Sequence, residues 1–381
     1  MQPWGFGERH SDLTTSTIHH YVPQWYQRRF LPSGETRFHL LNMEPWRMVN
    51  NRRVPMREVE RWGTKKCFQQ PDLYSVRVVG YPKDLFEKLF FGESDAAGAS
   101  AVEEVANAGS RTPISREGFT NFFQYLSVQS LRTPKGLAWL RQRLPPSSSK
   151  QDLLEHVQRY QHMRCVMWVE SFMDVVYHDE DVGFLLTDHP ITLYNKACFP
   201  RSSYCVFPND PAAAWKGTQT IFPLDTKKCF VLTHTEYAHN QKIRSQLTRP
   251  RTNPRLFGNT MAKTHQIVHR QISRDAVIQI NRILKWRAVR HIAAPTYEWL
   301  FPEEHCAKVQ WPDLGTHLLP TTDLWRNTGE ILMGLPDGRV YAQDQYGRSP
   351  GTAAEQAAAE AAAKRLLDQM KRIKKNVGKT D

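Results

Sequence analysis

Four clusters of ionisable or amide side chains stand inside otherwise apolar stretches of the chain. They are His19-His20-Tyr21 ahead of Pro23, Glu93, Gln129 with Arg132, and Thr187-Asp188-His189-Pro190. Burial of such a group without a partner costs about 1–3 kcal/mol, and more for a charge. We therefore expect the clusters to meet in the folded protein, with Glu93 pairing with Arg132 and the histidines close to Asp188.

Side chains of these types, once gathered, predict hydrolytic chemistry. His19, His20 and Asp188 are candidate ligands for a divalent metal such as Mg²⁺ or Mn²⁺, which would orient water against a phosphodiester. Alternatively, His20 is a general base beside a phosphate-binding Arg132, and no metal is needed. The predicted catalytic residues are His20, Glu93, Gln129, Arg132 and Asp188. A third interpretation is a buried polar network that only fixes how the helices pack.

The charge of the chain favours an anionic partner. Its 381 residues include 51 Lys/Arg and 38 Asp/Glu, a formal net charge of +13. Residues 241–300 hold twelve Lys/Arg against two acidic residues, and residues 24–66 hold ten against four. Concentrated positive charge is typical of proteins that bind nucleic acid, and a solvated basic surface is the alternative. The candidate nucleic-acid-binding residues are Arg249, Arg251, Arg255, Lys263, Arg270, Arg282 and Arg287.

Composition and motifs argue against several functional classes. The six cysteines show no C-x-x-C spacing, which argues against a thiolate zinc site and favours reduced thiols in the cytoplasm. No apolar run approaches the ~20 residues of a membrane helix, and the polar N-terminus lacks the apolar segment of a signal peptide. The chain also lacks a G-x-S-x-G elbow, a phosphate-binding loop and a G-x-G-x-x-G motif. We therefore expect a cytoplasmic protein without a membrane segment.

Residue patterns predict a mixed α+β fold. Apolar stripes, or the absence of Gly and Pro, predict helices over residues 82–108, 117–132, 150–177, 257–272 and 275–291. Runs of β-branched and aromatic residues predict strands at 36–43, 72–80, 183–195, 218–225 and 229–234. We expect a body over residues 1–300, mainly helical with a modest mixed or antiparallel sheet. Residues 312–381 are expected to form a small C-terminal appendage, a hairpin around Pro336-Asp337-Gly338 and a basic, alanine-rich helix.

Several segments, in order, resemble one protein family. They are HHYVPQWYQRRF, PDLY (71–74), the Glu93 helix, VQSLRTP (128–134), LLTDHP (185–190), the IFPL strand and the helix at 262–269. On these residues the chain is identified as a member of domain-of-unknown-function family 4238, found mainly in bacteria, from about residue 18 to 295. The resemblance implies a shared signature, which consists of His20, Tyr21, Pro23, Tyr74, Glu93, Gln129, Arg132, Asp188 and Pro190. His189 stands where the family pattern usually has Asn, and the resemblance implies no reaction.

Two shorter similarities point to nucleic acid. The HH-x-x-P segment resembles the start of the His-Asn-His nuclease motif, but no histidine follows His39 until His156. Residues 347–367 are similar to the last helix of double-stranded-RNA-binding domains. That helix needs basic residues at its start, where this chain has Gly351, Thr352 and Ala353.

The leading functional hypothesis is a nucleic-acid-directed phosphodiesterase, a nuclease that acts on RNA or DNA of an invader or of the host itself. In this hypothesis the basic block at 241–300 holds the nucleic-acid backbone. The alternative is a non-catalytic module that binds nucleic acid or protein and whose polar signature is a packing network. A small-molecule or nucleotide hydrolase is a third hypothesis, which predicts a deep pocket rather than an open basic groove.

Overall fold

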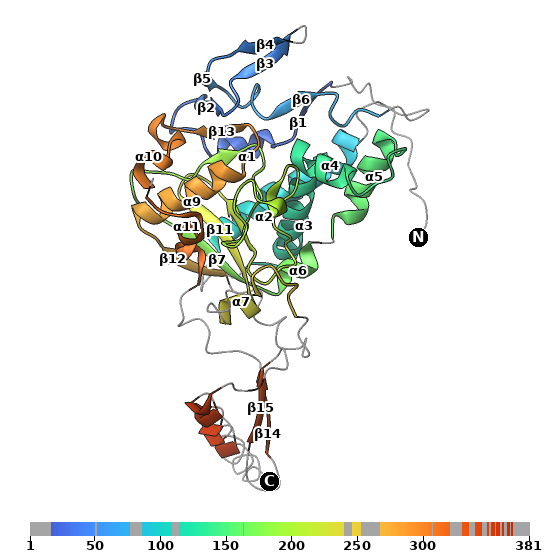
Figure 1. Cartoon of the computed structure of the whole chain (residues 1–381). Coiled ribbons are helices and arrows are strands. Elements are labelled where there is room, and N and C mark those ends of the chain that lie inside the picture. The colour runs from blue at the N-terminus through green and yellow to red at the C-terminus, as the bar shows by residue number, and fades with distance from the viewer. Residues whose placement is uncertain are drawn as a thin grey trace.

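The computed structural model describes residues 17–49, 52–76, 86–108, 114–162, 164–239, 246–252, 267–306, 308–320, 330–334 and 340–344, and parts of 349–368. The chain has a mixed α+β fold (Figure 1). The α-helices are α1 (Gln24–Arg28), α2 (Gly92–Asn107), α3 (Arg116–Arg132), α4 (Pro134–Arg141), α5 (Lys150–Tyr160), α6 (Cys165–Val169), α7 (Thr235–His239), α9 (Arg274–Arg287), α10 (Glu303–Cys306) and α11 (Trp311–Leu314). A π-helix, η1 (Phe86–Phe91), precedes α2, and short 3₁₀ turns lie at η2 (Ser203–Cys205), η4 (Glu298–Leu300) and η5 (Thr316–Leu318).

A five-stranded sheet runs through the middle of the body. Its strands, in order across the sheet, are β12 (Ile267–Gln271), β7 (Ser171–Tyr177), β11 (Lys228–His234), β10 (Gln219–Pro223) and β9 (Thr192–Tyr194). β12 is parallel to β7, and the other pairs are antiparallel. The sheet is therefore mixed, as one of the two predicted alternatives requires.

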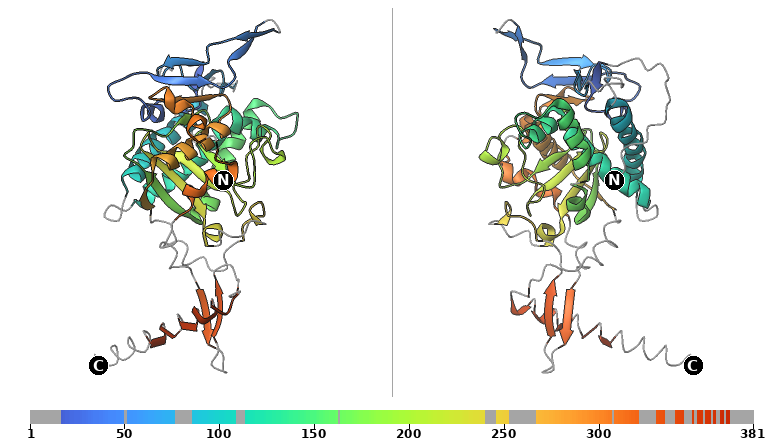
Figure 2. Two further views of the ribbon diagram at one scale, coloured as in Figure 1. Left: turned by 60° about the vertical axis from the view of Figure 1, so that its left-hand side comes forward. Right: turned by 90° about the vertical axis from the view of Figure 1, so that its right-hand side faces the viewer.

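Helices cover both faces of this sheet because apolar side chains alternate between the two faces along its strands, so both faces must be buried. Phe230 and Leu232 of β11 enter a core shared with α2 and α3. Cys229 and Val231 of the same strand enter a second core shared with α9. In Figure 2 the cyan-to-green helices α2 and α3 and the orange helix α9 lie on opposite sides of the sheet.

A second, four-stranded sheet connects segments that are distant in the sequence. Its order is β5 (Val59–Trp62), β2 (Phe38–Asn42), β13 (His291–Ala294) and β8 (Leu186–Thr187), and every pair is antiparallel. The sheet places the chain after α9 beside both the segment near residue 40 and the TDHP segment. Between β2 and β5 the chain leaves the sheet as a ribbon, β3 (Trp46–Val49) and β4 (Arg52–Pro55), which projects from the body (Figures 1 and 2). A short pair, β1 (Ile18–His20) with β6 (Gln69–Pro71), lies near the N-terminus.

Strand β7 corrects the predicted helix over residues 150–177. Helix α5 ends at Tyr160, α6 is five residues long, and Ser171–Tyr177 is a strand. The absence of Gly and Pro permitted a helix, but β7 pairs with β11 on one side and β12 on the other. Tertiary pairing decides such β-branched segments because strand preference depends on the neighbours that a strand finds.

Other predicted elements changed in extent. Residues 267–271 of the predicted helix 257–272 form strand β12, and residues 253–266 lie outside the described part. Residues 72–76 of the predicted strand 72–80 are not strand, and 77–80 lie outside the described part. The predicted strand 183–195 is divided into β8 and β9. The strands near 38–42, 219–223 and 228–234 and helices α3 and α9 confirm the corresponding predictions.

Residues beyond the expected body boundary at 300 pack into the second core. Trp311, Leu314 and Leu318 are buried there, and the side-chain amide of Gln219 donates to the carbonyl oxygen of Leu318 at 3.1 Å. The packed body therefore extends at least to Leu318. Farther along, β14 (Glu330–Gly334) and β15 (Val340–Asp344) pair antiparallel, and the turn expected at Pro336-Asp337-Gly338 lies outside the described residues.

Two findings concern the chain as a whole. None of the six cysteines is paired in a disulfide. Within the described residues, no helix combines the length and the apolar character needed to cross a lipid bilayer.

Candidate functional site

The two signature segments around residues 133 and 189 meet in the folded chain. Oγ1 of Thr133 lies 2.7 Å from Nδ1 of His189. Thr133 also caps the N-terminus of α4, because its Oγ1 accepts a hydrogen bond from the amide of Gly136 at 3.2 Å. Residue 136 must be glycine at this close approach of α4 to α3, since an added Cβ would overlap the carbonyl oxygen of Ser130. The junction of α3 and α4 is thus fixed against the loop that follows β8.

Lys135, in the first turn of α4, belongs to a buried cluster of charged side chains. Its Nζ lies 2.8 Å from Oδ1 of Asp210 and donates to the carbonyl oxygen of Arg287 at 3.2 Å. The guanidinium of Arg287 also pairs with Asp210, and Nε2 of His189 lies 3.6 Å from Oδ2 of the same carboxylate. One carboxylate therefore faces three basic side chains from three different parts of the chain.

Lys135 is the member of this cluster whose charge can change near neutral pH. Burial, together with the positive charge of Arg287, lowers the pKa of Lys135 to about 7. The negative charge of Asp188 opposes this effect. The Asp210 carboxylate, 2.8 Å from the Lys135 amine, also favours the protonated form. Burial and the charges of Lys135, Arg164 and Arg287 lower the pKa of His189 well below its usual value, so its ring is neutral at pH 7.

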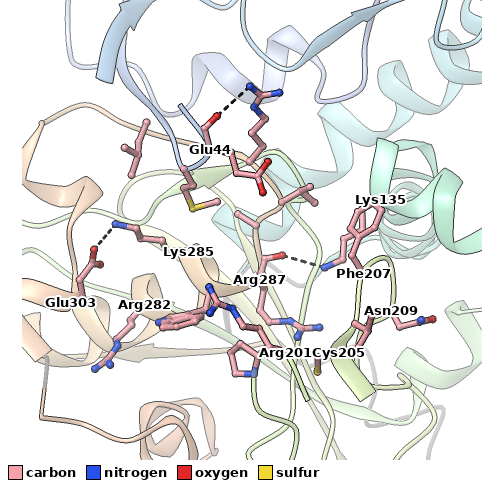
Figure 3. A pocket seen from close by; sticks show the side chains of 18 of the residues that line it. Glu44, Lys135, Arg201, Cys205, Phe207, Asn209, Arg282, Lys285, Arg287 and Glu303 are labelled. Atoms are coloured by element: carbon pink, nitrogen blue, oxygen red, sulfur yellow. Dashed lines mark hydrogen bonds and ion pairs between the residues drawn. The ribbon is translucent and has the colours of Figure 1, made fainter. Parts of the chain in front are cut away.

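A cavity of about 930 Å³ adjoins the cluster (Figure 3). Its walls come from the chain around residues 41–44, the segment 200–209 and residues 282–290 at the end of α9. In Figure 3, Lys135 and Phe207 lie on one side, and Lys285 and Glu303 lie on the other. The volume falls within the range of about 300–1,000 Å³ that is usual for ligand sites. Phe207 is 56% exposed, so this wall of the cavity is open to solvent.

Cationic side chains line the cavity, and carbonyl groups hold two of them. Arg282 donates to the carbonyl oxygen of Val309 at 2.9 Å, and Arg290 donates to that of Glu44 at 3.2 Å. Carbonyl oxygens orient a guanidinium without cancelling its charge. Lys285, by contrast, pairs with Glu303 at 2.6 Å.

Arg201 lies at the cavity beside an exposed aromatic ring. Its guanidinium is 5.9 Å from the centre of the Trp286 ring, and Trp286 is 45% exposed. Within the described part of the chain, Arg201 has no ion pair. The cavity therefore offers positive charge and a flat aromatic surface side by side, opposed by the carboxylates of Glu44 and Glu58.

Gln129 and Arg132 hold the N-terminal segment of the body in place. The side-chain amide of Gln129 donates to the carbonyl oxygen of Tyr21 at 2.9 Å, and Nη2 of Arg132 donates to that of His20 at 3.0 Å. Both side chains are buried, and Tyr74 donates to the carbonyl oxygen of Arg132 at 2.7 Å. All three acceptors are main-chain carbonyl oxygens, of Tyr21, His20 and Arg132. Such contacts are typical of side chains that hold segments together.

Arg132 pairs with Asp95, at 2.6 Å, and not with Glu93 as expected. Residues 93 and 95 both belong to α2, but residues two apart on a helix point in different directions. Glu93 is exposed, whereas Asp95 is turned toward the buried guanidinium. The prediction that a carboxylate of this helix turn pairs with Arg132 is confirmed, but the residue is Asp95 and the prediction of Glu93 was wrong.

Asp188 binds main-chain amides. Its Oδ1 accepts a hydrogen bond from the amide of Val289 at 2.9 Å, and its Oδ2 accepts from those of Arg290 at 2.7 Å and His291 at 2.8 Å. Val289 and Arg290 line the cavity, so Asp188 shapes the wall from behind. His291, rather than His19 or His20, interacts with Asp188. Burial lowers the pKa of His291, and the charge of the Asp188 carboxylate partly opposes this effect.

The proposed metal ligands His19, His20 and Asp188 do not assemble. Nδ1 of His19 accepts a hydrogen bond from the amide of Tyr74 at 3.0 Å, and its ring stacks on the Tyr74 ring. His20 lies beside the main chain of residues 64 and 65, and burial lowers its pKa. The part of the chain that the structure describes contains no group of three or more His, Cys, Asp and Glu residues able to hold a metal ion.

The predicted nucleic-acid-binding residues are divided among several places. Arg282 and Arg287 line the cavity, and Arg249 is exposed. Arg251 lies 3.4 Å from Glu170, and Arg270 lies 3.4 Å from Asp174. Arg255 and Lys263 lie outside the described residues.

Sequence reasoning missed Lys135, Arg201, Asp210 and Trp286. Lys135 directly follows the Arg132-Thr133-Pro134 segment, and this position in the sequence was the one feature that could have marked it as a candidate. Arg201 and Asp210 stand in an irregular stretch without periodicity, so no pattern linked them to a helix or strand. Trp286 lies within the predicted helix 275–291, where no pattern distinguished it from its neighbours.

One comparison with known proteins gives a match. A family model described as protein of unknown function (DUF4238) matches residues 18–296. The chain belongs to this family. The matched span includes Thr133, His189 and the α9 wall of the cavity, and it ends before Trp311. Neither the curated proteins nor the solved structures include a significant match.

Proposed function

We propose that the chain binds nucleic acid in this cavity, with phosphate groups at the arginines and a base against Trp286. The observation that carries the proposal is the lining of the cavity. Arg201, Arg282 and Arg290 have no acidic partner among the described residues and share one cavity with exposed aromatic rings. Guanidinium groups bind phosphate oxygens, and base stacking on an aromatic side chain contributes about 1–3 kcal/mol.

The cavity suits an unpaired strand. A base inside a duplex is stacked on its neighbours and cannot lie flat on Trp286, whereas a single-stranded base can. Asp188 and Thr133 support this function indirectly because they fix the cavity wall and the Lys135 junction. His20, Gln129 and Arg132 fix the N-terminal segment, and in this proposal they touch no ligand.

Binding is tested with the double variant R201A/W286A and a fluorescein-labelled 12-nucleotide single strand, as DNA and as RNA. Fluorescence anisotropy should show affinity at least about tenfold weaker than wild type, since one phosphate contact and one stacking surface are lost. The matched control is R159A/Y160A, which removes an exposed arginine and an exposed aromatic ring from α5. Equal binding by wild type and R201A/W286A would remove the cavity as the binding site.

A second function, cleavage of the bound phosphodiester, is favoured by Lys135. A group with a pKa of about 7 exchanges protons efficiently at neutral pH. As water adds to the phosphorus and the P–O bond to the leaving strand breaks, the protonated Lys135 would give its proton to the leaving oxygen, and the attacking water would lose a proton to solvent. Cleavage of an invader's or the host's own nucleic acid would be the biological setting.

Cleavage is tested by following the labelled strand on denaturing gels between pH 5.5 and 9. Wild type should show a rate that changes around pH 7, and K135R should lose that change because an arginine stays protonated throughout. Thermal melting of K135R checks that the Asp210 contact still supports the fold. An identical pH profile in both proteins would exclude Lys135 as the proton donor, and no cleavage at any pH would leave binding as the function.

A further inference from the structure

The ribbon β3–β4 is a basic projection that neither the cavity nor the core accounts for. It carries Arg47, Arg52 and Arg53, and Arg57 follows it. All four side chains are exposed, and no ion pair involves them in the described part of the chain. Met48 is 54% exposed, a high value for an apolar side chain within a strand. Figures 1 and 2 show the ribbon extending outward from the four-stranded sheet.

Both faces of the ribbon carry the same mixture of charge and apolar surface. The register pairs Trp46 with Pro55 and Met48 with Arg53 on one face. Because side chains alternate, Arg47, Val49, Arg52 and Val54 share the other face. On the first face, the guanidinium of Arg53 lies 4.5 Å from the centre of the Trp46 ring. A ribbon with cations on both faces matches a partner that presents negative charge on both sides of it.

The base of the ribbon is held rigidly to the body. Arg290 donates to the carbonyl oxygens of Glu44 and Trp46 and, through Nε, to Oδ1 of Asn42 at 3.1 Å. The amide of Met43 donates to the carbonyl oxygen of Arg290 at 2.8 Å. Arg290 and Glu44 also line the cavity, so the ribbon leaves the body at the edge of the candidate binding site.

We propose that the ribbon inserts into the major groove of double-stranded DNA beside the strand that the cavity holds. The major groove of B-form DNA is about 12 Å wide and admits a two-stranded ribbon, with phosphates along both walls. The major groove of A-form RNA is deep and narrow and excludes side chains. The inference rests on the proposed nucleic-acid function and adds the duplex form and the groove.

The experiment compares three probes of one sequence with the full-length protein: a blunt 20-base-pair DNA duplex, the same duplex as RNA, and its single DNA strand. Wild type should bind the DNA duplex at least about tenfold more tightly than the RNA duplex. In R47A/R52A/R53A, binding to the DNA duplex should weaken, and the slope of log affinity against log salt should decrease by about 2.7, as expected for three lost phosphate contacts. Binding to the single strand should stay at the wild-type level.

A matched variant controls for the loss of three charges. R116A/R159A/K308A removes exposed cations from other parts of the surface and should leave duplex binding unchanged. Wild type, but not R47A/R52A/R53A, should also protect guanine N7, which lies in the major groove, from dimethyl sulfate.

The results that would contradict DNA-groove binding by the ribbon differ from those that would contradict single-strand binding in the cavity. Duplex binding by R47A/R52A/R53A at the wild-type level, equal affinity for DNA and RNA duplexes, or unprotected guanine N7 would each overturn the ribbon proposal. Single-strand binding that depends on Arg201 and Trp286 would survive all three results. Absence of binding to every probe would overturn both proposals.

Discussion

The hydroxyl of Thr133 lies 2.7 Å from Nδ1 of His189, and this contact joins two segments that are 56 residues apart. The same hydroxyl accepts a hydrogen bond from the amide of Gly136 at the start of α4. One side chain therefore sets both the direction of α4 and the position of the loop after β8. Lys135 lies between these two contacts, so its place at the cavity depends on them.

Replacement of Thr133 with alanine should destabilise the protein by about 1–2 kcal/mol, because the N-cap of α4 and the contact with His189 are both lost. T133S keeps the hydroxyl and should remain within about 0.5 kcal/mol of wild type. Urea denaturation followed by tryptophan fluorescence measures both variants. Equal loss in T133A and T133S would mean that the methyl group, not the hydroxyl, matters at this position.

Removal of the Asp95 carboxylate should destabilise the protein, because Asp95 is the ion-pair partner of the buried Arg132. D95N leaves a buried guanidinium without its anion and should lower the free energy of unfolding by about 2–3 kcal/mol, below the usual range for fully buried pairs because Asp95 is 22% exposed. E93Q is the matched control and should be nearly neutral, since Glu93 is exposed on the same helix. A larger effect in E93Q than in D95N, measured by chemical denaturation, would restore the pairing first expected from the sequence.

His189 should make the protein less stable as the pH falls. Its pKa in the folded state lies well below the value of about 6.5 in the unfolded chain, so below pH 6.5 the unfolded state binds the extra proton. The stability that the neutral ring contributes is thus complete above pH 6.5 and is lost as the pH decreases. H189N, whose side-chain amide does not titrate in this range, should show a shallower loss between pH 6.5 and 5 in thermal melting. Parallel curves for the two proteins would contradict the low pKa of the buried ring.

Asp188 should stabilise the wall of the cavity more than it contributes to any reaction. D188N replaces one acceptor oxygen with an NH₂ group facing main-chain amides, and the expected cost is about 2–3 kcal/mol. Hydrogen exchange at the amides of Val289, Arg290 and His291 should become faster than in wild type. Unchanged exchange at these three amides, together with lost cleavage, would instead indicate direct participation in catalysis.

The sequence determined the parts of this protein that local chemistry controls. Apolar periodicity located α3 and α9, and β-branched runs located β2, β10 and β11, because each element buries one side or both sides of its own pattern. The signature residues also stood out, since polar groups within apolar stretches need partners. Membership of the family followed from the same residues.

The tertiary structure decided which partners those polar groups found. Asp95 and not Glu93 reached Arg132, and three backbone amides and not a histidine satisfied Asp188. Strand β7 formed within a predicted helix because β11 and β12 were available on its two sides. Arg201 and Trp286 are far apart in sequence and became a single surface only through folding. The type of a side chain shows which kind of partner it needs when buried. The distance between two side chains, and so the choice of partner, is fixed only when the whole chain has packed.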